Sequence, residues 1–443
     1  MGQGKQILAL NRFDADQANG LRAEVASLVK RRQATFGASS VLFYSEPIKM
    51  VRADGVWMYD SEGRRFLDVY NNVPSVGHCH PHVARAIAEQ VGTLNIHTRY
   101  LYDNIHTYAE RLLATFPERL SNVVFTCTGS ESNDLALRVA KIATGGEGFI
   151  VTETAYHGNT SAVMDVSPSS YKSRVVPRHV RTVPAPLSPV SGEDVGQVFA
   201  ASVKAAIADL ESNGVKFAGF LVDSIFSSDG IYADPAGFLK AAVDVVHAAG
   251  GMFISDEVQP GFGRTGAMWG FERHGVEPDI VTMGKPMGNG FPMGGMVTRP
   301  DLLEPFCEGT GYFNTFGGNP VAAAAGLAVL DVIEGEGLIR NADEVGTYFR
   351  TGLRELSNRF PVIGDVRGAG LFTGLEFNDE ETREPDTAMA TFVINGMKER
   401  GVLIGAAGFY GNTLKIRPPL CFSRENADLF FDVLTDVLGE ARN

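Results

Sequence analysis

The stretch GMFISDEVQPGFGRTG occupies residues 251–266, and DIVTMGKPMGNG follows it at residues 279–290. Each stretch contains a short apolar run, and polar side chains stand where that run ends: Asp256 and Gln259 in the first, Lys285 in the second. Short runs that are apolar throughout are typical of parallel strands buried on both faces of a sheet. Because ligands bind at the carboxyl ends of such strands, we expect these three side chains to share one site.

Four more apolar runs of this kind lie elsewhere in the chain, and helical stretches separate most of the six. This alternation predicts a doubly wound α/β fold, in which helices cover both faces of a large, mostly parallel sheet. The four further runs are VVFTC (123–127), GFIVTE (148–153), AGFLVDSI (218–225) and GGMVT (294–298).

The two ends of the chain predict a second, smaller α+β lobe. Residues 41–70 alternate in the manner of strands around turns, and helical and strand patterns alternate beyond residue 319. The Ser- and Pro-rich stretch 166–195 is expected to be flexible, either a surface excursion near the ligand or a plain loop. We therefore divide the chain into an N-terminal segment of the small lobe (1–70), a large ligand-binding α/β domain (71–325) and a C-terminal small α+β domain (326–443).

The composition excludes several classes of protein. Apolar residues make up 44% and charged residues 21% of the 443 positions, as in folded, water-soluble proteins. The formal net charge is -13 and no dense basic block occurs, so we expect no nucleic-acid partner. No apolar run approaches the roughly 18 residues needed to span a bilayer. The N-terminus shows no signal sequence, so we expect a cytoplasmic protein without a membrane partner.

The cysteines and histidines predict neither a disulfide framework nor a metal site. The four cysteines lie far apart, without the paired spacing of a zinc knuckle. Histidines cluster with one cysteine at residues 78–82, but Pro81 at the start of a predicted helix explains this segment more simply. The cysteines are Cys79, Cys127, Cys307 and Cys421.

The amine of Lys285 and the carboxylate of Asp256 have the properties that a pyridoxal phosphate site requires. Burial after an apolar strand lowers the pKa of a lysine, which frees the amine to form a Schiff base with a carbonyl. A carboxylate on a neighbouring strand end can hold a pyridinium nitrogen protonated. A simple ion pair at the edge of the sheet is the alternative explanation for these two residues.

The segment directly after the run at residues 123–127 could form a phosphate site. The segment TGSESND (128–134) leads into a predicted helix, at whose start Gly129 and Ser130 offer free backbone N–H groups. Ser130 acting only as a helix cap explains the segment equally well. Tyr156 follows a neighbouring strand and could stack on a flat ring, or serve only in packing.

Six phrases in this order resemble the class III, fold type I pyridoxal-phosphate aminotransferases, from about residue 36 to the end of the chain. The phrases are GHCHPHVARAI (77–87), TGSESNDLALR (128–138), AYHGN (155–159), SDEVQPGFGRTG (255–266), GKPMGNGFPMGG (284–295) and FNTFGGNP (313–320). The resemblance implies the fold type I transferase architecture, and it implies pyridoxal 5'-phosphate as the cofactor.

The resemblance also implies roles for the matching residues. Lys285 forms the Schiff base with the cofactor, and Asp256 pairs with its pyridine nitrogen. Thr315 reaches the cofactor phosphate of the partner subunit, which implies a homodimer with shared active sites. The other cofactor-binding residues are Gly129 and Ser130 at the phosphate, Tyr156 over the ring, Gln259 near the ring hydroxyl, and His157 and Asp223.

Within this family, the chain resembles the ethanolamine-phosphate and hydroxylysine-phosphate phospho-lyases. The segment between Asp68 and Gly77, VYNNVPSV, is shorter than in the aminotransferases proper. Asp223 and Ser224 stand where the family usually has Glu-Pro, and the shorter carboxylate does not suit the glutamate switch of the ω-amino transaminases. Two further phrases with this resemblance are TRYLYDNIHTYAERL (98–112) and LKIRPPLCF (414–422).

This closer resemblance implies a lyase that removes phosphate from a small phosphorylated amine. Ethanolamine phosphate would give acetaldehyde, ammonia and phosphate after the Lys285 amine removes the α-proton. If the substrate has no leaving group, the proton returns at the cofactor and the reaction is a transamination. A class III aminotransferase of ω-amino acids and 2-oxo acids is therefore the alternative.

Phosphate elimination requires a cationic pocket for the substrate. Arg417 is the first candidate, because a guanidinium can bind an oxyanion at two points. A site for a substrate carboxylate and a surface ion pair are the alternatives for Arg417. Arg99 and Lys415 are second candidates, and Asn71 and Asn72 could hydrogen-bond the substrate or merely form a turn.

Overall fold

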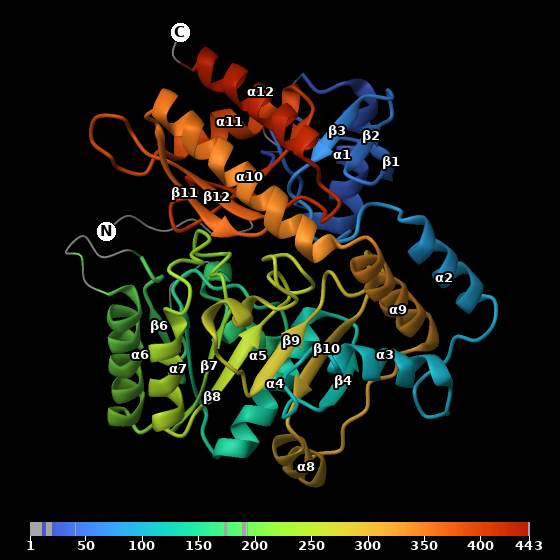
Figure 1. Ribbon diagram of the computed structural model, residues 1–443, viewed down its shortest axis with the longest axis vertical. Coiled ribbons are helices and arrows are strands. Elements are labelled where there is room, and N and C mark those ends of the chain that lie inside the picture. The colour runs from blue at the N-terminus through green and yellow to red at the C-terminus, as the bar shows by residue number, and fades with distance from the viewer. Residues whose placement is uncertain are drawn as a thin grey trace.

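The computed structural model describes residues 11–14, 20–39, 41–171, 175–187, 192 and 194–441. Figure 1 shows two lobes, one above the other, with the large sheet in the lower lobe. The upper lobe combines segments from both ends of the chain, drawn in blue and in orange to red.

A seven-stranded sheet forms the centre of the large lobe. Its strands are β4 (Asn122–Thr126), β5 (Gly148–Thr152), β6 (Val180–Val183), β7 (Phe217–Val222), β8 (Met252–Asp256), β9 (Ile280–Met283) and β10 (Gly294–Thr298). Their spatial order is β4-β10-β9-β8-β7-β5-β6, and only the pairs that involve β10 are antiparallel. All six predicted runs are strands of this sheet, so the predicted α/β fold is confirmed.

Helices cover both faces of the large sheet, because its strands are apolar on both faces. In β5, Phe149 and Val151 pack in one buried cluster with α4 and α8, whereas Ile150 packs in the other with α6 and α7. Successive strand residues point to opposite faces, so an unbroken apolar run buries both. The helices of this lobe are α3 (Asp103–Leu113), α4 (Gly129–Thr144), α5 (Ser161–Asp165), α6 (Val195–Ser212), α7 (Leu239–Ala248), α8 (Pro300–Gly309) and α9 (Pro320–Gly335).

The prediction of a flexible stretch at residues 166–195 is wrong for its middle part. Strand β6 lies there and pairs in parallel with β5, with Phe149 opposite Val180. Val180 and Val183 are buried, so packing at the sheet edge fixes this short segment. Residues 172–174, 188–191 and 193 of the stretch lie outside the described residues.

The small lobe contains two four-stranded sheets, in the orders β1-β2-β3-β13 and β11-β12-β15-β14. These strands are β1 (Met50–Asp54), β2 (Trp57–Asp60), β3 (Arg65–Asp68), β11 (Ile363–Ala369), β12 (Phe372–Phe377), β13 (Val402–Leu403), β14 (Gly405–Ala407) and β15 (Thr413–Ile416). The parallel pair β3–β13 joins the two ends of the chain, with Leu67 opposite Val402. The boundaries drawn at residues 70 and 325 stay a prediction.

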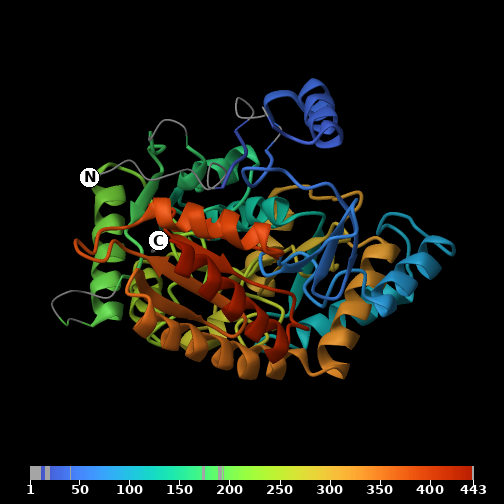
Figure 2. The same ribbon diagram turned by 90° about the horizontal axis from the view of Figure 1, so that it is seen from above.

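Helices complete the small lobe and its margin. Figure 2 shows α1 standing away from the body of the molecule, while α10, α11 and α12 lie against the strands. The helices are α1 (Ala23–Phe36), α2 (Pro81–Val91), α10 (Leu338–Arg359), α11 (Thr387–Glu399) and α12 (Arg424–Glu440). Contacts between α2 and α9 connect this margin to the large lobe.

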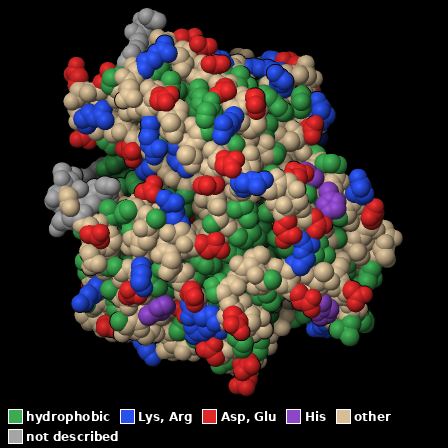
Figure 3. Space-filling model, in the orientation of Figure 1, with side chains coloured by type: hydrophobic (Ala, Val, Ile, Leu, Met, Phe, Trp, Pro, Cys, Tyr) green, Lys and Arg blue, Asp and Glu red, His purple; other side chains and the backbone are tan. Residues whose placement is uncertain are grey.

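The surface is mixed in charge on the face seen in Figure 3, where Lys and Arg side chains alternate with Asp and Glu. Among the described residues, no helix is long and apolar enough to cross a bilayer. The cytoplasmic location stays a prediction.

Candidate active site

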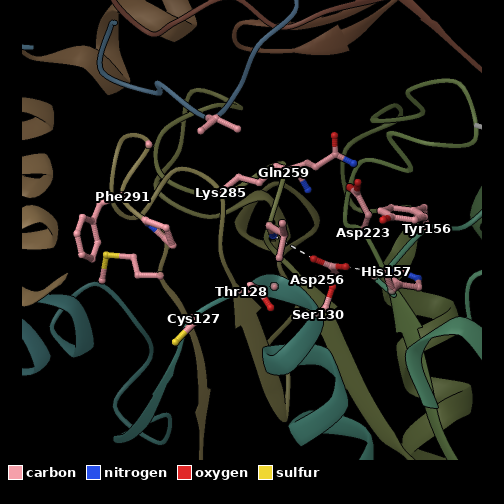
Figure 4. Close-up of a pocket in the computed structure, with 17 residues that line it drawn as sticks. Cys127, Thr128, Ser130, Tyr156, His157, Asp223, Asp256, Gln259, Lys285 and Phe291 are labelled. Atoms are coloured by element: carbon pink, nitrogen blue, oxygen red, sulfur yellow. Dashed lines mark hydrogen bonds and ion pairs between the residues drawn. The ribbon is translucent and has the colours of Figure 1, made fainter. Parts of the chain in front are cut away.

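A cavity of about 300 Å³ lies at the carboxyl ends of β7, β8 and β9. Figure 4 shows Lys285 above Asp256, with Thr128 and Ser130 at the start of α4 below them. The carboxyl ends of neighbouring parallel strands meet at one edge of a sheet, which explains why distant segments converge here. The lining residues are Val73, Cys127, Thr128, Gly129, Ser130, Tyr156, His157, Gly158, Asp223, Asp256, Val258, Gln259, Lys285, Gly290, Phe291, Pro292 and Met293.

Asp256, the last residue of β8, is held by three hydrogen bonds. His157 Nδ1 lies 2.7 Å and Asn133 Nδ2 lies 3.0 Å from its Oδ2, while the Val258 N–H donates to Oδ1 over 3.0 Å. The side chain is almost completely buried. These donors fix the carboxylate, and Nε2 of His157 is left without a partner among the described residues.

Lys285 follows β9 by two residues and reaches the same cavity. The pairing of Asp256 with Thr282 in adjacent parallel strands brings the two segments together. The Lys285 side chain is open to the cavity, but the surrounding walls withdraw it from bulk water. This desolvation, and then the positive charge of Arg417, lowers the pKa of Lys285, against the opposing effect of the nearby carboxylates. A lowered pKa makes more of the neutral, nucleophilic amine available.

A backbone cradle lies at the start of α4. Thr128 caps this helix by accepting a hydrogen bond from the Glu131 N–H at 3.1 Å, and Ser130 Oγ accepts one from the Asn159 N–H at 3.2 Å. Gly158 approaches so closely that a Cβ there would stand 2.5 Å from Ser130 Oγ. Its φ of +139° also lies in the region that favours glycine. The cradle thus leaves free N–H groups and a positive helix end open to a phosphate.

Gln259 connects the cavity to Arg417 through a directed chain of hydrogen bonds. Arg417 Nη1 donates to Gln259 Oε1 over 2.5 Å, and Gln259 Nε2 donates to Ser227 Oγ over 2.7 Å. The Ser227 hydroxyl in turn donates to Asp223 Oδ2. Lys415 Nζ lies 3.5 Å from the same hydroxyl oxygen. A guanidinium and a carboxylate are therefore joined through two neutral groups rather than in direct contact.

The charged side chains around these hydrogen bonds are buried, and the two cations lack direct carboxylate partners. Arg417 is 8% and Lys415 2% exposed, and neither forms an ion pair with a carboxylate in the described part of the chain. Burial lowers the pKa of both groups, and their mutual repulsion lowers that of Lys415 further. Burial, with the nearby Asp256 charge, raises the pKa of Asp223 against its hydrogen bonds. The pocket is consequently suited to an anionic ligand.

Most of the predicted cofactor residues meet in this one cavity. Tyr156 lines it beside Asp223, as Figure 4 shows, and burial raises the pKa of its hydroxyl. Thr315 lines a second cavity of about 530 Å³, which shares Cys127, Phe291 and Pro292 with the first. Its predicted contact with a partner's cofactor stays a prediction.

None of the predicted substrate residues lines the cavity of this subunit, and Arg417 is connected to it through Gln259. Arg99 is exposed, with its guanidinium carbon 4.1 Å from the centre of the Phe313 ring. Asn71 Nδ2 donates to Asp68 Oδ2 over 3.0 Å, as a turn residue would. Asn72 is buried, and its Nδ2 has no partner among the described residues. Their binding roles stay predictions.

The cluster at residues 78–82 pairs with carboxylates instead of gathering around a common point. His78 Nε2 lies 2.7 Å from Asp68 Oδ2, and His80 Nε2 lies 3.0 Å from Glu336 Oε1. Among the described residues, no group of three or more histidine, cysteine, aspartate and glutamate side chains could hold a metal ion.

Sequence reasoning missed three residues of the site. Asn133 stands one helical turn after Gly129, a spacing that places both on one face of the helix and could have revealed it. Val258 lines the cavity two residues beyond Asp256, and its methyl group would lie 2.8 Å from a Cβ at Gly129. Ser227 lies in the loop after β7, where no periodic pattern marks its position.

A family model described as aminotransferase class-III matches residues 43–438. The chain belongs to this family. The class-III resemblance of its motifs is therefore confirmed, and with it the dependence on pyridoxal phosphate.

Relatives of this class-III chain carry two kinds of name. A solved structure described as a phospholyase from Arthrobacter in complex with phosphoethanolamine is 44% identical, with a TM-score of 0.90. The match covers 93% of this chain and 99% of the Arthrobacter chain. An "ethanolamine-phosphate phospho-lyase homolog 1" of Caenorhabditis elegans is 38% identical over 90% of both chains. An "alanine--glyoxylate aminotransferase 2-like" protein of Drosophila melanogaster is 41% identical over 97% of this chain and 91% of its own.

The cavity of this class-III enzyme fits pyridoxal phosphate. The cradle of Ser130 and Gly158 suits the cofactor phosphate, and its tightness leaves no room for a larger side chain at position 158. The fixed Asp256 carboxylate suits the ring nitrogen, and the Lys285 amine suits the aldehyde. We infer these contacts from the chemistry of the groups that line the cavity.

Proposed function

We propose that this class-III enzyme is a phospho-lyase that acts on a small phosphorylated amine. With ethanolamine phosphate and water, the products are acetaldehyde, ammonia and phosphate. One observation carries the proposal: Arg417 is buried close to the Lys285 cavity and forms no ion pair with a carboxylate of the described residues. Its side-chain partners are the neutral Gln259 and Tyr70. Its Nε has no partner at all among the described residues. A buried guanidinium left in this state suits an oxyanion of the substrate.

Lys285 and Asp256 carry the proton chemistry in this proposal. Bound pyridoxal phosphate supplies an aldehyde for the substrate amine and a ring that accepts the electrons of a deprotonated carbon. The Lys285 amine, whose pKa is lowered, takes the proton from the carbon next to nitrogen. Asp256, fixed by His157 and Asn133, keeps a proton on the ring nitrogen.

Arg417 and Lys415 bind the phosphate and favour its departure. As the carbon–oxygen bond breaks, negative charge grows on the phosphate oxygen, and two nearby cations stabilise it most strongly at that point. Lys415 lies on β15 with Arg417 just beyond the strand's end, and both reach toward the Ser227–Gln259 chain. Both cations are held by the small lobe, whereas Lys285 belongs to the large lobe.

The names of relatives support two activities. The Arthrobacter structure and the Caenorhabditis relative support elimination, and the Drosophila relative supports transamination. Asp223 favours elimination, because it binds Ser227 and the Ile225 N–H instead of pairing with Arg417. This arrangement of Asp223 does not suit a carboxylate gate for two unlike substrates.

Incubation with ethanolamine phosphate in the absence of a keto acid separates the two activities. We expect continuous release of phosphate and ammonia in equal amounts, since the lyase regenerates its cofactor in every turnover. Phosphate by a colorimetric assay and ammonia by a coupled assay give the two rates. Turnover that stops after about one product molecule per active site, and resumes only when a keto acid is added, would establish the transaminase instead.

The proposal includes a homodimer with shared active sites. Large apolar side chains are exposed at the Thr315 cavity. Phe316 lines the cavity and is 69% exposed, and Tyr100, which stacks on the lining residue His97, is 62% exposed. Apolar groups gathered on a surface favour a protein interface. Light scattering of the holoenzyme is expected to give twice the mass of 47.6 kDa; a monomer mass would contradict this part of the proposal.

A further inference from the structure

Ser227 is the meeting point of the polar groups behind the cofactor cavity. Its side chain is fully buried, although it belongs to the loop after β7. The hydroxyl oxygen contacts Asp223, Gln259 Nε2 at 2.7 Å and Lys415 Nζ at 3.5 Å. The backbone N–H of Ser227 also donates to Asp223 Oδ2 over 3.3 Å. One hydroxyl thus links both lobes of the molecule.

The Ser227 hydroxyl has a single proton, and the partner that receives it determines which groups donate and which accept in the neighbouring hydrogen bonds. Asp223 accepts hydrogen bonds from the Ser227 hydroxyl, the Ser227 N–H and the Ile225 N–H, as an ionised carboxylate does. With its proton given to Asp223, the Ser227 oxygen can only accept. Gln259 must therefore turn its amide nitrogen toward Ser227, which leaves its amide oxygen facing Arg417.

This orientation of Gln259 matters for Arg417. An amide oxygen holds the guanidinium in place through a 2.5 Å hydrogen bond but does not neutralise its charge, as a carboxylate would. The Tyr70 ring, 4.6 Å from the guanidinium carbon, supports it on another side without cancelling the charge. The rest of the guanidinium keeps its full attraction for an anion.

We propose that Ser227 is a positioning residue that fixes the Gln259 amide and thereby holds Arg417, still fully charged, for the phosphate of the substrate. The inference rests on the proposed phospho-lyase function, because it assigns Arg417 to the substrate phosphate. Without the hydroxyl, the Gln259 amide nitrogen loses its buried acceptor. The amide is then no longer fixed on that side, and its oxygen no longer holds the Arg417 guanidinium in place.

The test compares how holoenzyme variants discriminate between ethanolamine phosphate and ethanolamine. The absorption change of the bound cofactor on rapid mixing gives the apparent affinity for each amine. Ser227→Ala is expected to lower the apparent affinity for ethanolamine phosphate about tenfold. The apparent affinity for ethanolamine should stay within about twofold of the wild-type value, because only the phosphorylated amine contacts Arg417. General destabilisation would weaken both amines alike and leave their ratio unchanged.

Ser228→Ala is the matched control, since Ser228 is the next residue of the same buried loop and its hydroxyl forms no hydrogen bond with the described residues. We expect it to keep the wild-type ratio of affinities. If Ser227→Ala does not fold, Ser227→Cys keeps a similar volume with a much weaker donor and should lower the ratio in the same direction. Ser227→Thr, which restores the hydroxyl, should recover the preference at least in part.

The outcomes distinguish the inference from the function on which it rests. Wild-type enzyme that shows no preference for ethanolamine phosphate would overturn the proposed function itself. A clear wild-type preference that persists in Ser227→Ala or Ser227→Cys would overturn only the role of Ser227. An equal loss of preference in Ser228→Ala would also overturn it, because the effect would then belong to the loop as a whole.

Discussion

Replacing Lys285 with alanine is expected to lower the turnover number by about a thousandfold or more. The amine is the only basic side chain among the residues that line the cavity, apart from His157, which is held at Asp256. Its lowered pKa provides the neutral form that both attacks a carbonyl and removes a proton. The rate of phosphate release from ethanolamine phosphate measures the loss.

Lys240→Ala is the matched control for this change. Lys240 lies on the surface of α7, with 63% of its side chain exposed, and pairs with Asp244 over 3.3 Å. We expect the turnover number of Lys240→Ala to remain within about twofold of the wild-type value, as for most surface substitutions. A Lys285→Ala enzyme that keeps a tenth or more of wild-type turnover would remove Lys285 from the catalytic role.

Replacing Arg417 with alanine is expected to raise the KM for ethanolamine phosphate about a hundredfold. Removing one partner of a buried charged contact costs about 2–5 kcal/mol, and about 1.4 kcal/mol corresponds to a factor of ten. Arg417 is buried and has an unpartnered Nε, so its removal takes a guanidinium out of a pocket that water reaches poorly. Steady-state kinetics of phosphate release give KM and the turnover number separately.

Two variants control for charge and for stability. Arg417→Lys should recover only part of the affinity, because an ammonium cannot bind phosphate at two points. Arg400→Ala removes a partly exposed arginine that pairs with Glu440 at the surface, and should leave KM unchanged. If Arg417→Ala instead raised the KM for a 2-oxo acid and left the KM for ethanolamine phosphate unchanged, Arg417 would bind a substrate carboxylate.

The sequence predicts the large sheet well because its strands are nearly continuous apolar runs. Strand β6 escaped prediction, since the four residues of Val180–Val183 lie among Ser and Pro and are fixed by pairing with β5. The roles of neighbouring residues at a strand end follow from the alternation of faces. Asp256 faces the cavity, whereas Glu257 accepts the Gly270 N–H at 2.7 Å, and burial raises its pKa to about 7.

The candidate site was predictable where function follows from the end of a strand. Lys285, Asp256 and Gln259 all stand at such ends, and the structure brings them to one cavity. Ser227 was not predictable, because its place depends on the turn around Asp223 and on side chains from the other lobe. Contacts between lobes leave no periodic trace in either segment.

The most direct test of the central claim is to locate the covalent attachment of the cofactor. Borohydride reduction of the holoenzyme, followed by proteolysis and mass spectrometry, identifies the lysine that is joined to pyridoxal phosphate. We expect the added mass on the peptide that contains Lys285. Attachment at Lys415, a buried lysine near the cavity whose pKa is also lowered, would contradict the assignment.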